Sequence, residues 1–340
     1  MEERRILILS VDSLSIGYLS GKNRTVLLSP LNATATKGEL IAVIGRNGIG
    51  KSTLLRTITG LQNSLGGDIF FSNRSIRKYS RLELAQKVGF ISTEIVKIAN
   101  MNVYELVSLG RFPYTNWLGK IDSKDHEIIM DSIEKTGMRD LYNRNISELS
   151  DGERQRAMVA RVLAQDTEII IMDEPTAFLD IKSKYEIMHL MHELTEKKGK
   201  TIIFSTHDFN IAVSQADKIW LILDERLIEG APEDLMIKGS FDNLFDSSVV
   251  GFNSLDGSFS FRRKERGSIY IEGNGNWRHW TEKAVIRAGF SLSEARGNFI
   301  IKVPASGFKN WVVTTPDQSL EFISILDLVN WLNHEFIHFT

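Results

Sequence analysis

Short apolar runs alternate with amphipathic stretches along the first two thirds of the chain. The runs are expected to form buried strands: Leu40–Ile44, Val88–Ile91, Ile169–Met172, Ile202–Ser205 and Ile219–Leu223. The stretches between them place apolar residues at helical spacing, which predicts helices over Ser52–Leu61, Asp122–Thr136, Glu153–Ala164 and Lys182–Lys197. This alternation predicts an α/β fold in which helices cover both faces of a mainly parallel sheet.

The pattern changes after about Ala231. Shorter elements follow, with strands expected at Ser258–Arg263, Ser268–Glu272, Phe299–Val303 and Trp311–Thr315, and helices at Trp277–Ala288 and Leu320–Phe336. Four of the six tryptophans lie in this part, which indicates a core of its own. We therefore expect two domains, an α/β domain over residues 1–240 and a small α+β accessory domain over residues 241–340.

Composition narrows the classes of function. The net charge of -2 gives no general attraction to nucleic acid or acidic membranes, and the absence of cysteine excludes disulfides and thiolate metal sites. The apolar run Ile6–Leu9 is too short for a signal peptide, and no stretch approaches the roughly 18 apolar residues that span a bilayer. We expect a cytoplasmic protein that would need a partner to hold it at a membrane.

The segment GRNGIGKST, residues 45–53, follows an expected strand and opens an expected helix. This is the context that the phosphate-binding pattern G-x-x-x-x-G-K-[ST] requires. Its glycines permit unusual backbone angles and close approach of amide groups to phosphate, Lys51 supplies a cation, and Ser52 supplies a hydroxyl for Mg²⁺. The nucleotide-binding residues expected here are Gly45, Asn47, Gly48, Gly50, Lys51, Ser52 and Thr53.

Two acids end the expected strand in EIIIMDEP, residues 168–175. Ligands of open α/β sheets bind at this carboxyl edge, so Asp173 is expected to hold Mg²⁺ and Glu174 to polarise the attacking water. His207 follows another strand and could contact the γ-phosphate and brace Glu174. Alone, the acids could form an ordinary acidic turn and the histidine could be structural, but the phosphate-binding segment favours a catalytic site.

Five motifs in this order resemble the ATP-binding subunits of ABC transporters: GRNGIGKST, LSDGERQR, IIIMDEP, TAFLD and STHD. The resemblance covers residues 5 to about 230. It implies a P-loop NTPase fold with a helical subdomain at about 95–165 and an antiparallel edge, and an ATPase that uses ATP and Mg²⁺. Tyr18 falls where family members stack an aromatic ring on adenine, although it could equally be an ordinary strand residue.

The same resemblance implies a homodimer in which each ATP lies between two subunits. Ser150, the amide of Gly152 and the helix that begins there would bind, in trans, the γ-phosphate held by the other copy. An ordinary capped helix is the alternative. The chain departs from the usual LSGGQ at Asp151 and Glu153, where an added acid near phosphate would weaken the closed dimer unless it points away.

A second departure concerns the metal. The family generally has a glutamine after the strand that ends in KVGF, and this chain has Thr93 there, with Glu94 beside it. Thr93 is too short to reach equally far, and Glu94 is a possible metal ligand.

The stretch NVYELVSLGRFPYTNW, residues 102–117, resembles the permease-docking segment of importers for iron–siderophore complexes, haem or cobalamin. This implies a peripheral protein on the cytoplasmic face of the inner membrane, bound to transmembrane permease subunits and acting indirectly with a substrate-binding protein, without nucleic acid. Two alternatives are a soluble ABC ATPase acting on ribosomes or nucleic acid, and an ATPase module regulated by a ligand of its tail.

Overall fold

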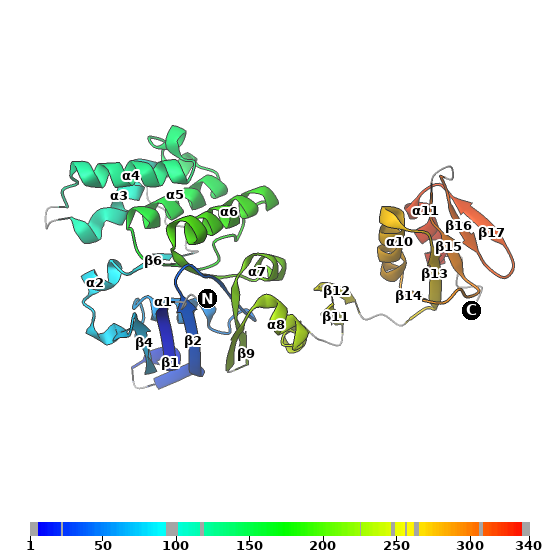
Figure 1. Ribbon diagram of the computed structural model, residues 1–340, viewed down its shortest axis with the longest axis horizontal. Coiled ribbons are helices and arrows are strands. Elements are labelled where there is room, and N and C mark those ends of the chain that lie inside the picture. Colours follow the sequence, from blue (N-terminus) through cyan, green and yellow to red (C-terminus); the bar gives the residue numbers. More distant parts are fainter. Residues whose placement is uncertain are drawn as a thin grey trace, which may run out of the picture. The chain divides into compact units, whose positions relative to one another are not determined.

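The chain forms two compact units, Met1–Leu244 and Phe245–Thr340. The structure is a computed structural model that describes residues 6–21, 23–92, 101–115, 119–224, 226–245, 249–255, 257–261, 265–305 and 309–334 (Figure 1). Among these residues, no helix has both the length and the apolar character needed to cross a membrane.

A six-stranded sheet forms the centre of the first unit, in the order β10-β9-β3-β8-β7-β6. Its strands are β3 (Leu40–Gly45), β6 (Val88–Ile91), β7 (Ile169–Met172), β8 (Thr201–Ser205), β9 (Lys218–Leu223) and β10 (Arg226–Gly230). All neighbours are parallel except β10, which runs antiparallel to β9. The residues of β3, β7 and β8 are buried throughout, as expected for strands covered on both faces, so the predicted α/β fold is confirmed.

A separate antiparallel sheet, in the order β2-β1-β4-β5, lies beside the first (Figure 1). It consists of β1 (Leu7–Ser20), β2 (Asn23–Thr36), β4 (Gly66–Phe71) and β5 (Arg74–Ser75). The pattern of apolar residues did not predict the long strands β1 and β2. Register shifts interrupt their pairing at several points, and each shift breaks the alternation of buried and exposed positions that identifies a strand.

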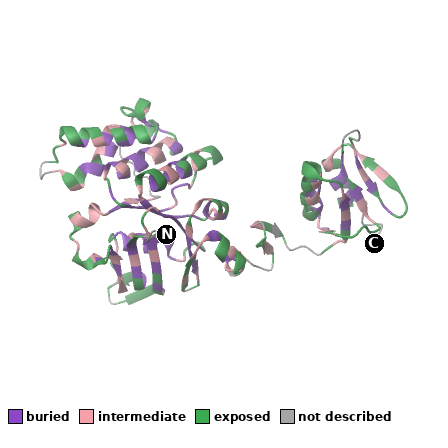
Figure 2. Ribbon diagram, viewed as in Figure 1, coloured by how far each residue is buried: buried purple, intermediate pink, exposed green. Residues whose placement is uncertain are grey.

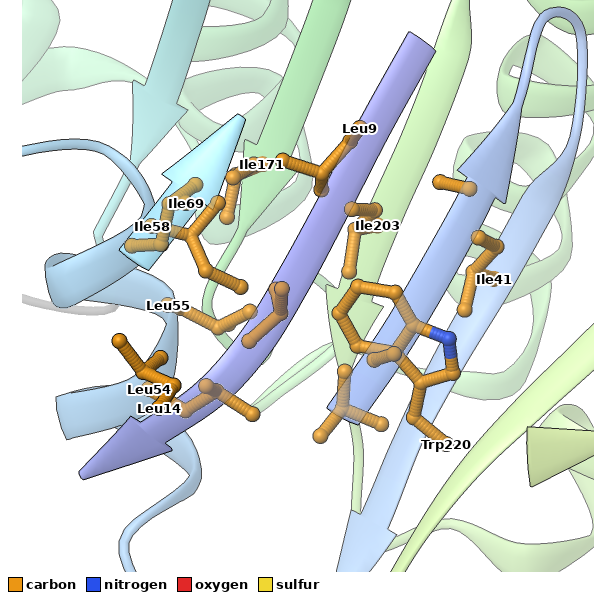
Figure 3. Close-up of a cluster of buried hydrophobic side chains, with 14 of the residues drawn as sticks. Leu9, Leu14, Ile41, Leu54, Leu55, Ile58, Ile69, Ile171, Ile203 and Trp220 are labelled. Atoms are coloured by element: carbon orange, nitrogen blue, oxygen red, sulfur yellow. The ribbon is translucent and has the colours of Figure 1, made fainter. Parts of the chain in front are cut away.

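Helix α1 (Lys51–Ile58) connects the two sheets through a shared core. Figure 3 shows Leu54, Leu55 and Ile58 of this helix beside Leu14 and Ile69 of the antiparallel sheet. The same cluster continues to Trp220 of β9, which is fully buried. Because close-packed interiors resist deformation, this core fixes the start of α1 relative to the ends of the strands.

Helices on the other side of the parallel sheet form the helical part of the unit (Figure 1). Besides α1, the α-helices of the first unit are α2 (Arg81–Ala85), α3 (Val103–Ser108), α4 (Ser123–Lys135), α5 (Asp151–Ala164), α6 (Ile181–Lys198), α7 (Phe209–Gln215), α8 (Pro232–Ile237) and α9 (Asp242–Phe245, which ends in the second unit). A 3₁₀ helix, η2 (Leu109–Tyr114), follows α3. Buried Arg111 fixes η2, since its guanidinium donates to Asp125 of α4 at 2.8 Å and to the carbonyl of Ala164 at 2.9 Å.

The second unit is an α+β fold with one sheet in the order β14-β13-β15-β16-β17. Its elements are β11 (Val250–Asn253), β12 (Ser258–Phe261), β13 (Ser268–Glu272), α10 (Gly275–Arg287), β14 (Ser291–Leu292), β15 (Ile300–Lys302), β16 (Trp311–Thr314), β17 (Ser319–Phe322) and α11 (Ile325–His334). A core around Trp311 and Trp331 is separate from that of the first unit, and Figure 2 shows buried residues inside each.

The prediction of a helix over Leu320–Phe336 is wrong for its first residues. Residues 319–322 form β17, which pairs antiparallel with β16, and the helix α11 begins only at Ile325. Leu320 and Phe322 are partly buried while their neighbours are exposed, which is the alternation of a strand. The apolar residues of the strand and the helix run together in the sequence and conceal the boundary.

Candidate nucleotide-binding site

The loop between β3 and α1 wraps around the amine of Lys51. Its Nζ donates to the carbonyl of Gly45 at 2.8 Å and to that of Arg46 at 3.3 Å, and the side chain is buried. Gly50 has φ of 115° and Gly48 has φ of 77°, so the loop uses conformations that residues with a Cβ rarely adopt. Such a loop presents successive amide groups and a cation to an anion.

The expectation of an unusual backbone angle at Gly45 is wrong. Gly45 has no positive φ; it is a glycine because a Cβ would lie 3.0 Å from the carbonyl oxygen of Ile222 in β9. Its role is therefore close packing between strands, whereas Gly48 and Gly50 shape the loop.

Burial lowers the pKa of the Lys51 amine, and the nearby carboxylates of Glu174 and Asp173 oppose that shift. A buried amine that contacts neutral carbonyl groups favours a ligand that brings more negative charge than these groups supply. The phosphates of a nucleotide have that property.

The two acids after β7 differ in burial and in partners. Asp173 is buried, and its Oδ1 accepts from the Ser205 hydroxyl at 2.6 Å and from Ser52 Oγ at 3.1 Å. Glu174 is partly exposed, and its backbone N–H donates to Ser205 Oγ at 2.9 Å. Its φ of 48° is uncommon for a residue other than glycine, and such strain is typical of functional sites.

His207 lies at the end of β8, next to the acids. Its Nδ1 is 3.2 Å from Oε1 of Glu174, and its ring is more than half exposed. The predicted neighbourhood of His207 and Glu174 is thus present. A histidine there can orient the carboxylate and still reach a ligand.

A pocket of about 450 Å³ joins these groups. Its lining includes Asn47, Gly48, Gly50, Lys51, Ser52, Thr53, Glu174 and His207. Tyr18 of β1 also lines it, with its ring about half exposed and its hydroxyl 2.8 Å from Thr53 Oγ1. Asp173 and Gly45 lie outside the lining, and Asp173 is linked to it through Ser52. Stacking of Tyr18 on an adenine remains a prediction.

Ser150 and Gly152 do not line this pocket. Ser150 is exposed and is the N-cap of α5, where its Oγ accepts from the N–H of Glu153. Gly152 is buried, and a Cβ on it would lie 2.9 Å from Ser183 Oγ of α6. Close approach of two helices is therefore a sufficient reason for a glycine at this position. Its amide as a phosphate donor in trans stays a prediction.

Sequence reasoning missed the role of Ser205, whose hydroxyl connects Asp173 with the backbone of Glu174. A hydroxyl directly before the THD motif at a strand end was the available signal. Thr93, Glu94 and Trp117 lie outside the described residues. Among the described residues, no cluster of three or more histidines or acids suits a metal held by the protein alone.

The motif positions agree with known proteins. The model of the ABC transporter family matches residues 28–177. An uncharacterized ABC transporter ATP-binding protein of Methanocaldococcus jannaschii, MJ0873, is 34% identical over 272 residues, which are 79% of this chain and 92% of that protein. The chain belongs to the ATP-binding subunits of ABC transporters.

Further similarities cover both units of the chain. The model of the iron ABC transporter C-terminal domain matches residues 266–333. The iron(3+)-hydroxamate import ATP-binding protein FhuC of Bacillus subtilis is 37% identical over 204 residues, 60% of this chain and 74% of FhuC. The dimeric ATP-binding cassette MJ0796 with ADP and Pi has a TM-score of 0.59 at 27% identity, covering 66% of this chain and 99% of that one.

These similarities show that the chain binds ATP and is an ATPase. They favour a transport subunit over the alternative of an ATPase acting on ribosomes or nucleic acid. The ATP-binding cassette fold predicted from the motifs is confirmed.

The Ser205→Ala variant tests the hydroxyl that sequence reasoning missed. We expect a fall in kcat of about tenfold or more, because the carboxylate of Asp173 and the backbone of Glu174 lose a common anchor and catalysis is sensitive to small displacements. The free energy of unfolding should also fall by about 1–3 kcal/mol, since the buried carboxylate of Asp173 loses a donor and the N–H of Glu174 loses its acceptor. Steady-state ATPase kinetics and thermal unfolding measure both effects.

Ser214→Ala is the control, as it removes a hydroxyl from the exposed side of α7. Equal kcat values for the two variants would show that Ser205 has no role in positioning the acids.

Proposed function

We propose that the chain hydrolyses ATP as a head-to-tail homodimer that drives an importer for an iron complex. The proposed dimer rests on one observation: the residues expected to contact ATP lie in two separate places on the chain. The pocket contains the phosphate loop, Glu174 and His207, whereas Ser150 is exposed and lies outside the lining. A second copy would supply the missing donors. The similar cassette MJ0796, which is dimeric with ADP and Pi bound, supports the proposal of a dimer.

The oxygen donors of Ser52 in the pocket and of Asp173 beside it suit Mg²⁺. Ser52 Oγ and Asp173 Oδ1 are hard ligands 3.1 Å apart, next to the loop that would hold the phosphates. Mg²⁺ usually takes only one or two protein ligands and completes its shell with phosphate oxygens and water. When bound, the ion would neutralise part of the phosphate charge; Ser52 and Asp173 would hold it, and Glu94 remains a further candidate from the sequence.

In the proposed reaction, Glu174 orients and polarises a water molecule for attack on the γ-phosphate. Ser205 fixes the backbone of Glu174, and His207 holds its carboxylate. The Lys51 amine binds the transferred phosphate, exchanging carbonyl partners of the loop for phosphate oxygens. Loss of the γ-phosphate removes the contact between the two copies and lets them separate.

A second pocket, of about 600 Å³, is a candidate surface for the permease. It lies between the end of α1, α2 and η2, and its lining includes Leu61, Leu84, Phe112 and Pro113. Three apolar side chains of the lining are exposed, Phe112 (72%), Leu61 (66%) and Leu109 (46%), and exposed apolar side chains that gather in one place mark interaction surfaces. We propose that a helix of a membrane permease occupies this groove and holds the chain at the cytoplasmic face of the membrane, with a substrate-binding protein acting on the permease.

The iron complex as cargo is supported by two similarities. One is the match of residues 266–333 to the iron ABC transporter C-terminal domain, and the other is FhuC, which is named for import of iron(3+)-hydroxamate. We propose residues 241–340 as the accessory domain of such an importer. A siderophore, haem or cobalamin would be bound by other components, because the cargo need not touch the subunit that hydrolyses ATP.

The Phe112→Asp variant tests the importer function. Phe112 is exposed in the chain alone, and the permease helix is proposed to bury it. A charge at this position should therefore lower uptake of ⁵⁵Fe from a ferric hydroxamate by about tenfold or more, because aromatic anchors dominate interface energetics. Uptake is measured in cells that depend on the chain for iron, and the subunit bound to membranes is measured in parallel. ATPase activity of the purified variant should stay within about twofold of the parent.

Ile237→Asp is the matched control, since Ile237 of α8 is also exposed (85%) but lies outside the groove. Normal iron uptake by Phe112→Asp, with normal membrane association, would refute docking at this groove.

A further inference from the structure

The start of α5 already contains an anion. Oε2 of Glu153 accepts from the Ser150 N–H at 2.8 Å and from the Ser150 hydroxyl at 2.9 Å. The Glu153 N–H in turn donates to Ser150 Oγ at 3.3 Å, which completes a reciprocal capping box. The one proton of the Ser150 hydroxyl is thus directed at a carboxylate of the same chain.

That carboxylate is ionised in the physiological range. Hydrogen bonds from the Ser150 N–H and hydroxyl lower the pKa of Glu153, and the charges of Arg144 and Arg156 act in the same direction. A carboxylate also suits the start of a helix, where backbone N–H groups favour negative charge. The first turn of α5 is therefore satisfied electrostatically before any nucleotide arrives.

The cations around this turn are engaged with other acids. Arg154 pairs with Asp151 at 2.7 Å, and Arg156 pairs with Glu186 of α6 at 3.0 Å. Asp151 and Glu153 therefore have different hydrogen-bond partners, although both are acids in the same helical turn. Asp151 is bound to an arginine on the helix surface, whereas Glu153 is bound to the serine that is expected to contact phosphate.

We propose that Glu153 is an internal competitor for the γ-phosphate and sets the threshold for closure of the ATP-bound dimer. This inference rests on the head-to-tail dimer proposed above. Closure would require the Ser150 hydroxyl to leave the carboxylate and turn to the phosphate of the opposite pocket, with Glu153 moving away from the incoming negative charge. Closure would then be weaker than in a chain with a neutral residue at position 153.

The competition can be measured with Glu153→Gln in a Glu174→Gln background, where ATP is not consumed. Glutamine preserves the capping box, so the helix start should stay folded. The dimer dissociation constant in saturating Mg-ATP, from sedimentation equilibrium, should fall by about tenfold. A hydrogen bond to a charged group is stronger than one to a neutral group, and each dimer contains two such contacts.

Asp151→Asn in the same background is the matched control. It removes the same charge from the same helical turn but leaves the Ser150 contact intact, and its dissociation constant should change by less than about twofold. An equal effect of both variants would show that only the charge of the turn matters, which overturns the proposed competition.

Dimerisation of these variants distinguishes the role of Glu153 from the head-to-tail dimer on which that role rests. If Glu174→Gln alone does not dimerise with Mg-ATP, and neither double variant does, the head-to-tail arrangement fails. If Glu174→Gln dimerises and the Glu153→Gln change leaves its dissociation constant unaltered, the dimer stands and the role of Glu153 is refuted.

Discussion

Glu174→Gln should abolish nearly all ATP turnover and leave a stable ATP-bound dimer. Removal of a general base costs about 10²–10⁴-fold in rate, and glutamine has nearly the same shape without the basicity. The backbone of Glu174 would still donate to Ser205, so the loop should keep its conformation. Phosphate release measures turnover, and sedimentation velocity with Mg-ATP measures the dimer.

His207→Ala is the informative comparison for this result. His207 contacts Glu174 at 3.2 Å from a more exposed position, so its loss should lower the rate while Glu174 still polarises water. We expect a smaller rate effect than for Glu174→Gln. A Glu174→Gln chain that hydrolyses ATP at the parent rate would assign the base to another residue.

The phosphate loop and the acid pair could be predicted from the sequence because their chemistry is local. The segment from Gly45 to Thr53 contains its own glycines, cation and hydroxyl, and its position between a strand and a helix can be read from neighbouring residues. Asp173 and Glu174 are likewise recognisable at the end of an apolar run. Convergence of these segments follows from the rule that carboxyl ends of parallel strands share one edge of the sheet.

Contacts between distant segments could not be predicted in this way. The hydroxyl of Ser205 reaches Asp173 because β8 pairs with β7 in one register, which the sequence does not state. Packing of Gly152 on Ser183 depends on how closely α5 approaches α6. Both facts change the interpretation of a motif, since one adds a residue to the site and the other gives a glycine a structural role.

The same distinction explains the errors in the fold. The bulges of β1 and β2 remove the period of two that identifies strands, whereas the pairing of β1 with β2 and with β4 makes these segments a sheet. The sequence predicts a helix at residues 320–322 because their apolar side chains continue into α11, whereas pairing with β16 makes them a strand. Tertiary pairing decided the structure in both places.

Lys51→Met should weaken ATP binding by about 100-fold or more without destabilising the fold. The amine would form charge-assisted bonds to phosphate, and losing several of them at once costs a few kcal/mol. In the free protein the same amine is buried among carbonyl groups, and burial of its charge is unfavourable. Methionine has a similar length and no charge, so the melting temperature of the nucleotide-free variant should stay the same or rise.

A loss of ATP affinity without a fall in melting temperature distinguishes a binding role of Lys51 from a structural one. Equilibrium binding of a fluorescent ATP analogue gives the affinity, and calorimetry of the nucleotide-free protein gives the melting temperature. Arg46→Met serves as the control because Arg46 is an exposed cation of the same loop that does not line the pocket. A fall of several degrees for Lys51→Met with affinity unchanged would make Lys51 a structural clamp of the loop, since its bonds to Gly45 and Arg46 would then be its main contribution.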